Sequence, residues 1–131
     1  MSEYTIKNLK EDVEDQAPKF GLSPNLEARM ARVALELENF GLSYQRIAPN
    51  FRVPFGHTHN VQEEAYVVVN GSVRVKLGDE VHDLRQWDVV RVPKDTIRGF
   101  EAGPDGVELL AIGAPNTGPG DANVEQNWWS D

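Results

Sequence analysis

Three residues of metal-binding type lie close together in the sequence, at a spacing that could bring them to one point. They are His57 and His59, with Glu64 a few positions further on. In a β-strand, residues two apart face the same way, so both imidazoles can point to one place. Residues 64–69 have the composition of a strand, so the carboxylate can join the rings from an adjacent antiparallel strand. Two imidazoles and one carboxylate suit Zn, Mn, Fe(II) or Ni and leave positions open for water or substrate.

The composition excludes several other kinds of chemistry. The chain has no cysteine, which removes thiol nucleophiles, disulfides and zinc sites built on thiolates. It also has no Gly-x-Ser-x-Gly motif and no glycine-rich phosphate-binding loop. We therefore expect neither nucleophilic catalysis nor an organic cofactor.

The charge of the chain argues against anionic partners. Thirteen Lys and Arg stand against twenty-one Asp and Glu, a formal net charge of −8. This sign is opposite to that of a nucleic-acid-binding or membrane-surface protein, so we expect neither partner. The first residues lack the pattern of a secretory signal, and no stretch approaches the ~20 apolar residues of a membrane span. We expect a cytoplasmic protein.

The elements that must position the three residues are nearly all strands. Residues 1–22 are polar and acidic and are expected to form an N-terminal arm, residues 23–114 a β-barrel domain, and residues 115–131 a loop-like C-terminal tail. Ser23 and Pro24 are a helix-start signal, which predicts a short helix over residues 24–31. Residues 33–38 alternate as a strand does, and we favour a strand over a continued helix there.

Beyond residue 40 the chain consists of short runs rich in β-branched and aromatic residues, which turn residues separate. Asn70-Gly71 and Gly78-Asp79 predict hairpin turns. Many short antiparallel strands without intervening helices predict an all-β sandwich or barrel. The predicted strands cover residues 42–48, 51–58, 63–70, 72–78, 80–85, 88–92, 96–101 and 107–113.

The first motif of this region resembles that of the cupin superfamily of small jelly-roll barrels. In that motif one residue separates two histidines, three or four residues separate the second histidine from a glutamate, and six residues separate the glutamate from a glycine. His57, His59, Glu64 and Gly71 match this spacing. The resemblance covers residues 42–113 and implies that the three side chains point into the barrel, where family members usually hold a divalent metal. It also implies a homodimer, for whose contacts the two terminal segments are suited.

The second cupin motif is degenerate here. Of its pattern only Pro93 is kept, and Arg98 stands where the resemblance implies a last metal-binding histidine. Arginine has no free lone pair and cannot be a ligand. Three arrangements follow: Arg98 points inward and pairs with Glu64 in a metal-free pocket, it points away and leaves a three-ligand site, or it receives an anionic substrate together with a metal.

Other side chains are assigned by strand parity. Tyr66 shares its face with Glu64 and either fills the core or contacts a ligand, and Phe100 shares its face with Arg98 and is favoured as part of the wall. Tyr66, Arg98 and Phe100 are the candidates for contact with a small-molecule ligand. Glu63 and His82 are expected at the surface. Trp87 and the pair Trp128 and Trp129 are expected to dock on the barrel or at a subunit contact.

Two functions are compatible with this sequence. The first is a metal-dependent enzyme, in which His57, His59 and Glu64 hold the metal and Arg98 orients a small anionic substrate. The second is a non-catalytic small-molecule binder or sensor, in which Arg98 replaces the metal. A third possibility, a structural dimerisation module that uses the tryptophan-rich tail, needs no ligand.

Overall fold

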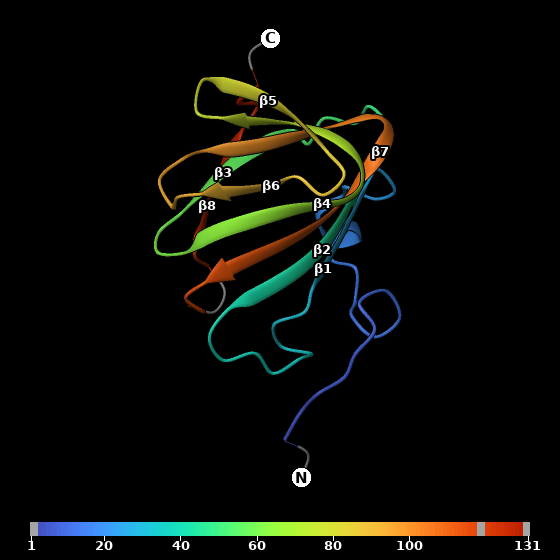
Figure 1. Ribbon diagram of the computed structural model, residues 1–131, viewed down its shortest axis with the longest axis vertical. Coiled ribbons are helices and arrows are strands. Elements are labelled where there is room, and N and C mark those ends of the chain that lie inside the picture. The colour runs from blue at the N-terminus through green and yellow to red at the C-terminus, as the bar shows by residue number, and fades with distance from the viewer. Residues whose placement is uncertain (1–2, 118–119, 130–131) are drawn as a thin grey trace.

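The computed structural model describes residues 3–117 and 120–129, which form strands with one short 3-10 helix, η1 (Figure 1). In chain order the elements are η1 (Ala17–Phe20), β1 (Leu26–Met30), β2 (Gly41–Ile47), β3 (Phe55–His59), β4 (Glu63–Leu77), β5 (Glu80–Arg85), β6 (Val89–Val92), β7 (Arg98–Ala114) and β8 (Ala122–Gln126). No helix in the described part of the chain is long and apolar enough to cross a membrane.

Two long strands, β4 and β7, join the rest into one curled sheet of antiparallel strands. They pair with each other along most of their 15 and 17 residues. The sheet order is β1-β2-β7-β3-β8, and β4 adds β5 and β6 on its other side. Because β4 and β7 curve strongly, the sheet folds over itself as a jelly roll (Figure 1).

The bend in β4 depends on a glycine. The pairing of β4 with β7 shifts register between Val68 and Asn70 and again between Gly71 and Val73. Gly71 has a φ of 80°, and a Cβ at this position would lie 2.1 Å from the carbonyl oxygen of Gly106 on β7. The two strands can approach this closely only with glycine at residue 71.

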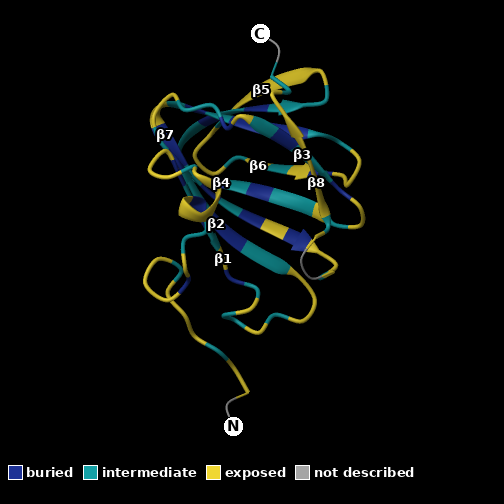
Figure 2. Ribbon diagram, turned by 180° about the vertical axis from the view of Figure 1, so that it is seen from behind, coloured by how far each residue is buried: buried dark blue, intermediate teal, exposed yellow. Residues whose placement is uncertain are grey.

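The core lies between the walls of the curled sheet. Alternate residues of β4 and β7 are buried, and the dark inner bands in Figure 2 follow this period. The core is mainly aliphatic, with two aromatic rings. Its largest fully buried side chains are Ile47, Tyr66, Val68, Val73, Val75, Val92 and Leu109.

The all-β jelly-roll fold is confirmed, but two predicted elements near the N-terminus are wrong. Residues 24–31 do not form a helix: Leu26–Met30 is strand β1, which pairs with β2 and buries Leu26 and Ala28. The short helix is instead η1, at Ala17–Phe20. Residues 33–38 form turns rather than a strand, and Val33 is exposed.

Of the two hairpin turns predicted further along the chain, one is found and the other is not. Gly78-Asp79 does link β4 to β5 as a hairpin. Asn70-Gly71 does not end a strand, because it forms the bulges inside β4. The predicted strands over residues 96–101 and 107–113 are parts of the single strand β7, which begins only at Arg98, and the tail predicted to be loop-like contains strand β8.

Candidate functional site

The side chains of His57, His59 and Glu64 converge between β3 and the start of β4. Both histidines lie on β3, and Glu64 lies at the start of β4, after the short connection that the sequence predicts. One ligand atom from each residue lies within 4.8 Å of the others. The Glu64 Oε1 atom is 3.0 Å from His59 Nε2 and 3.6 Å from His57 Nε2. The three donors therefore face one point.

Arg98 points inward and pairs with Glu64. It is the first residue of β7 and stands opposite His57 in the strand register. Its side chain is fully buried, with Nη1 at 3.1 Å from Glu64 Oε1 and Nη2 donating to the carbonyl oxygen of Pro93 at 2.7 Å. Of the orientations that the sequence left open, the inward one is found.

Glu64 is the centre of this polar cluster. The hydroxyl of Tyr66 donates to Glu64 Oε1, the same oxygen that Arg98 contacts. Burial alone would raise the pKa of Glu64, but His57, His59 and Tyr66 outweigh it and hold that pKa far below its ordinary value. Glu64 is therefore a carboxylate throughout the physiological pH range. Phe100 packs against the Tyr66 ring, with 4.9 Å between the ring centroids.

His59 is oriented by a residue that the sequence analysis missed. Its Nδ1 lies 3.0 Å from Oδ2 of Asp121, in the segment just before β8. Burial alone would lower the pKa of His59, but the carboxylates of Glu64 and Asp121 outweigh it and raise the pKa above its ordinary value. No local pattern could reveal Asp121, because it meets His59 from a point in the sequence 62 residues away.

The second nitrogen of His59 has no hydrogen bond to any described residue. Nε2 is buried and has no hydrogen-bond partner among the residues described, although Glu64 Oε1 lies 3.0 Å away. The short distance thus reflects proximity without the alignment of a hydrogen bond. A buried nitrogen in this state beside a carboxylate is suited to binding a cation.

These donors fit a divalent metal with three protein ligands. A histidine whose other ring nitrogen meets a carboxylate is the usual arrangement of a metal-binding imidazole. Arg98 lies opposite His57 in the strand register and places a positive charge beside the three donors. The site is therefore a three-ligand set with a built-in cation beside it.

The remaining residues singled out in the sequence lie outside this cluster. Glu63 and His82 are exposed; Glu63 pairs with Arg91, and His82 lies near Glu80. Trp87 is also exposed, with a relative accessibility of 69%. Trp128 and Trp129, in contrast, lie against the barrel wall and the cations of Lys76 and Arg52.

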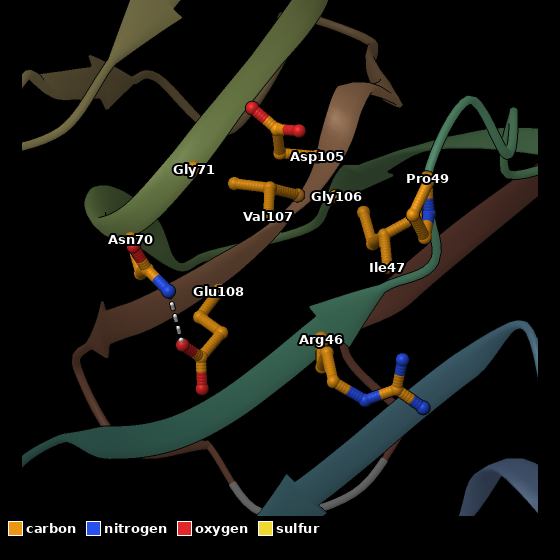
Figure 3. A pocket seen from close by; sticks show the side chains of 9 residues that line it. All are labelled: Arg46, Ile47, Pro49, Asn70, Gly71, Asp105, Gly106, Val107 and Glu108. Atoms are coloured by element: carbon orange, nitrogen blue, oxygen red, sulfur yellow. Dashed lines mark hydrogen bonds between the residues drawn. The ribbon is translucent and has the colours of Figure 1, made fainter.

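A separate pocket of about 200 Å³ lies on the outer surface, where β2 meets the bulge of β4 and the bend of β7 (Figure 3). Three of its polar side chains are already engaged with protein, since Asn70 donates to Glu108 and Arg46 pairs with Glu27. It contains no residue of the histidine cluster. Its lining consists of Arg46, Ile47, Pro49, Asn70, Gly71, Asp105, Gly106, Val107 and Glu108.

Several solved structures resemble this fold. A cupin protein from Bacteroides fragilis superposes with a TM-score of 0.72 at 21% identity, over 92% of this chain and 91% of that one. KdgF from Halomonas sp. gives a TM-score of 0.67 at 17% identity, over 86% of this chain and 94% of its own. Oxalate decarboxylase from Bacillus subtilis gives 0.74 at 21% identity, over 91% of this chain but only 33% of that chain. No protein-family model and no curated protein sequence matches the chain.

Proposed function

We propose that this chain, which has the cupin fold, is a metal-dependent enzyme that holds one divalent cation on His57, His59 and Glu64 and acts on a small anionic molecule. The observation that carries the proposal is the buried Nε2 of His59, which lacks a hydrogen bond within the described part of the chain and lies 3.0 Å from the Glu64 carboxylate. His57 and Glu64 supply the other two donors within 4.8 Å.

The chemistry of His59 supports a cation at this point. In the neutral ring, the proton on Nδ1 is donated to Asp121, and Nε2 carries a lone pair. A lone pair facing a carboxylate oxygen is unfavourable unless a positive charge lies between them. A divalent ion satisfies both groups, and Asp121 raises the basicity of the ring that binds it.

The charges of the site favour an anionic ligand. Glu64 and Asp121 carry one negative charge each and Arg98 one positive charge, so a divalent ion leaves a net positive charge with both histidines neutral. When bound, the metal would supply a Lewis acid that polarises an oxygen of the ligand. The similar fold of oxalate decarboxylase, an enzyme named for a small carboxylate substrate, agrees with this charge.

The accessible side of the cluster is that of His57. Its side chain is 22% exposed, against 13% for Glu64 and 9% for His59, so we propose that the ligand enters there. Arg98 and Tyr66 lie behind Glu64 and hold its carboxylate in place. Contact of Tyr66, Arg98 or Phe100 with the ligand stays a prediction.

A second candidate is a metal-free binding protein, and the ion pair between Arg98 and Glu64 favours it. The guanidinium is fully buried at 3.1 Å from the carboxylate and so neutralises Glu64 without a metal. In this candidate a proton on His59 replaces the cation, and the cluster recognises a small molecule without catalysis.

Metal analysis separates the two candidates. Chelator-treated protein without a tag is titrated with Zn²⁺ and with Mn²⁺, followed by elemental analysis after desalting. We expect one equivalent in the native protein and none in the His57→Ala, His59→Ala double variant, with the exposed His82→Ala as the matched control. If the native protein retains no more metal than a folded double variant, the metal proposal is wrong. Oxalate binding that needs no added metal would then support the second candidate.

The homodimer implied by the cupin resemblance and the cytoplasmic location also stay predictions. Light scattering coupled to size-exclusion chromatography tests the first, with a mass near twice the 14.6 kDa of one chain as the expected result.

A further inference from the structure

The strand that carries both histidines receives most of its backbone pairing from the C-terminal segment, residues 121–129, which we call the strap. Within the strap, β8 pairs with β3 from Phe55 to His59. On its other side β3 meets β7 only at the pair of His57 and Arg98. In Figure 1 the strap runs alongside β3 at the edge of the sheet. The position of β3 therefore depends on the strap.

Asp121 fixes the strap at its N-terminal end. The carboxylate meets His59 Nδ1 and also accepts hydrogen bonds from the backbone N–H groups of Val61 and Gln62, at 3.1 Å each. The backbone carbonyl of Asp121 accepts a further bond from the N–H group of Asn60. Residues 60–62 form the connection between β3, which carries both histidines, and Glu64 on β4. One side chain, only 7% exposed, thus holds both the His59 ring and the loop between the ligands.

Trp128 fixes the strap at its other end. Its indole lies against Gly56 of β3 and Gly99 of β7, and a Cβ at either glycine would lie 2.2 or 2.6 Å from Trp128 Nε1. The ammonium of Lys76 lies 4.3 Å from the centre of the same ring, within the range of a cation–π contact. The glycines beside His57 and Arg98 therefore form a seat for this indole.

We infer that Asp121 is a positioning residue of the metal site and that docking of the strap and binding of the cation stabilise each other. Asp121 turns the ring of His59 so that Nε2 faces Glu64, and the docked strap holds Asp121 in place. The inference rests on the proposed metal site. By thermodynamic linkage, a strap that strengthens metal binding must itself be held more tightly when the metal is bound.

The first arm of the test needs no metal. Chelator-treated protein labelled with ¹⁵N-histidine contains only three histidines, so each imidazole signal can be assigned by single substitution. We expect His59 to carry its proton on Nδ1 in the native protein and to lose this preference in Asp121→Ala. Asp121→Asn, which keeps one acceptor oxygen, is expected to restore part of it. An unchanged His59 tautomer in folded Asp121→Ala would overturn the positioning role.

The second arm measures the coupling by Zn²⁺ titration. Loss of a carboxylate that orients a metal-binding histidine typically weakens metal affinity 10- to 100-fold, and we expect this for Asp121→Ala. Trp128→Ala, which removes the distant anchor, is expected to weaken Zn²⁺ affinity in the same direction. The losses of Zn²⁺ affinity should not be additive in the Asp121→Ala, Trp128→Ala double variant, because both substitutions release the strap. Asp83→Ala and Trp87→Ala, at exposed positions on the outer wall, are the matched controls.

Strap docking is followed by fluorescence in a Trp87→Phe background, where Trp128 and Trp129 are the only tryptophans. We expect Zn²⁺ to shift their emission to the blue and to slow proteolysis within residues 121–129. Native Zn²⁺ affinity in both strap variants would refute the coupling. If the native protein binds no Zn²⁺, the proposed function and the coupling fail together, while the tautomer of His59 still decides the positioning role of Asp121.

Discussion

Replacing Arg98 by methionine should strengthen metal binding while weakening the metal-free fold. Among the described residues, Arg98 is the permanent cation in contact with the ligand set, and Arg98→Met removes its charge while filling part of its volume. In the metal-free protein this leaves the Glu64 carboxylate without its buried partner, which typically costs about 3–5 kcal/mol. The melting temperature of the metal-free variant should therefore fall by roughly 10–20 °C.

The gain in metal affinity can be worked out from the contact between Arg98 and Glu64. Nη1 lies 3.1 Å from Glu64 Oε1, and a metal bound to that oxygen would be about 2.2 Å from it, so the two cations are at most about 5.3 Å apart. Their repulsion is about 6 kcal/mol at an effective dielectric constant of ~20 and about 1.5 kcal/mol at that of water. Even the lower figure corresponds to roughly a tenfold gain in affinity.

The assay is a competition between the protein and a chelator for Zn²⁺, combined with thermal melts in the absence and presence of the metal. We expect at least tenfold tighter binding in Arg98→Met and a larger metal-induced rise in melting temperature than in the native protein. The matched control is Arg91→Met, which breaks the exposed pair of Arg91 with Glu63 and should change neither quantity. A folded Arg98→Met variant with native or weaker Zn²⁺ affinity would refute the electrostatic reasoning.

Three further substitutions test other parts of the structure. Tyr66→Phe removes the hydroxyl that donates to the Glu64 carboxylate and should lower the free energy of unfolding in urea at pH 7 by about 1–2 kcal/mol. Gly71→Ala places a methyl group 2.1 Å from a backbone oxygen of β7 at a φ of 80° and should cost at least about 2 kcal/mol in the same measurement. The Tyr44 hydroxyl and further donors lower the pKa of Glu108, so this carboxylate adds stability above pH 4.5 that is lost as the pH falls through its folded pKa. Glu108→Gln should therefore be less stable at pH 7 and lose less stability between pH 7 and pH 3 than the native protein.

Each of these expectations has a result that contradicts it. Native stability of Tyr66→Phe would mean that the hydrogen bond from the Tyr66 hydroxyl to the Glu64 carboxylate adds nothing to the free energy of unfolding. A tolerated Gly71→Ala would show that β4 and β7 can separate at the bulge at little cost. If Glu108→Gln lost as much stability between pH 7 and pH 3 as the native protein, the acid sensitivity would belong to other carboxylates.

The cluster could be predicted from the sequence because its members are local. His57 and His59 follow the two-residue period of a strand, and Glu64 follows after a connection too short to carry it far away. The cupin resemblance likewise implied that Arg98 belongs near these residues. Its orientation was left open because a long side chain can point into or away from a barrel from the same backbone position.

The elements that were predicted wrongly depend on distant partners. Leu26 and Met30 have helical spacing after a good helix-start signal, but the edge of β2 was available to pair with them as a strand. Asn70-Gly71 carries the signal of a turn, and here the same backbone freedom bends a continuous strand. Asp121 gave no signal at all, because its role is created by pairing between two strands that lie far apart in the chain.

The pairing of β3 with β8 also has a consequence for how the chain acquires its structure. β3 ends at residue 59 and its main partner begins at residue 122, so both strands of this ladder exist only after nearly all of the intervening barrel has been synthesised. Closing so long a loop is entropically costly, and contacts of such high sequence separation form slowly. The histidine strand is therefore expected to find its neighbour among the last steps of folding, after the pairing of β4 with β7 has formed the surface on which both are placed.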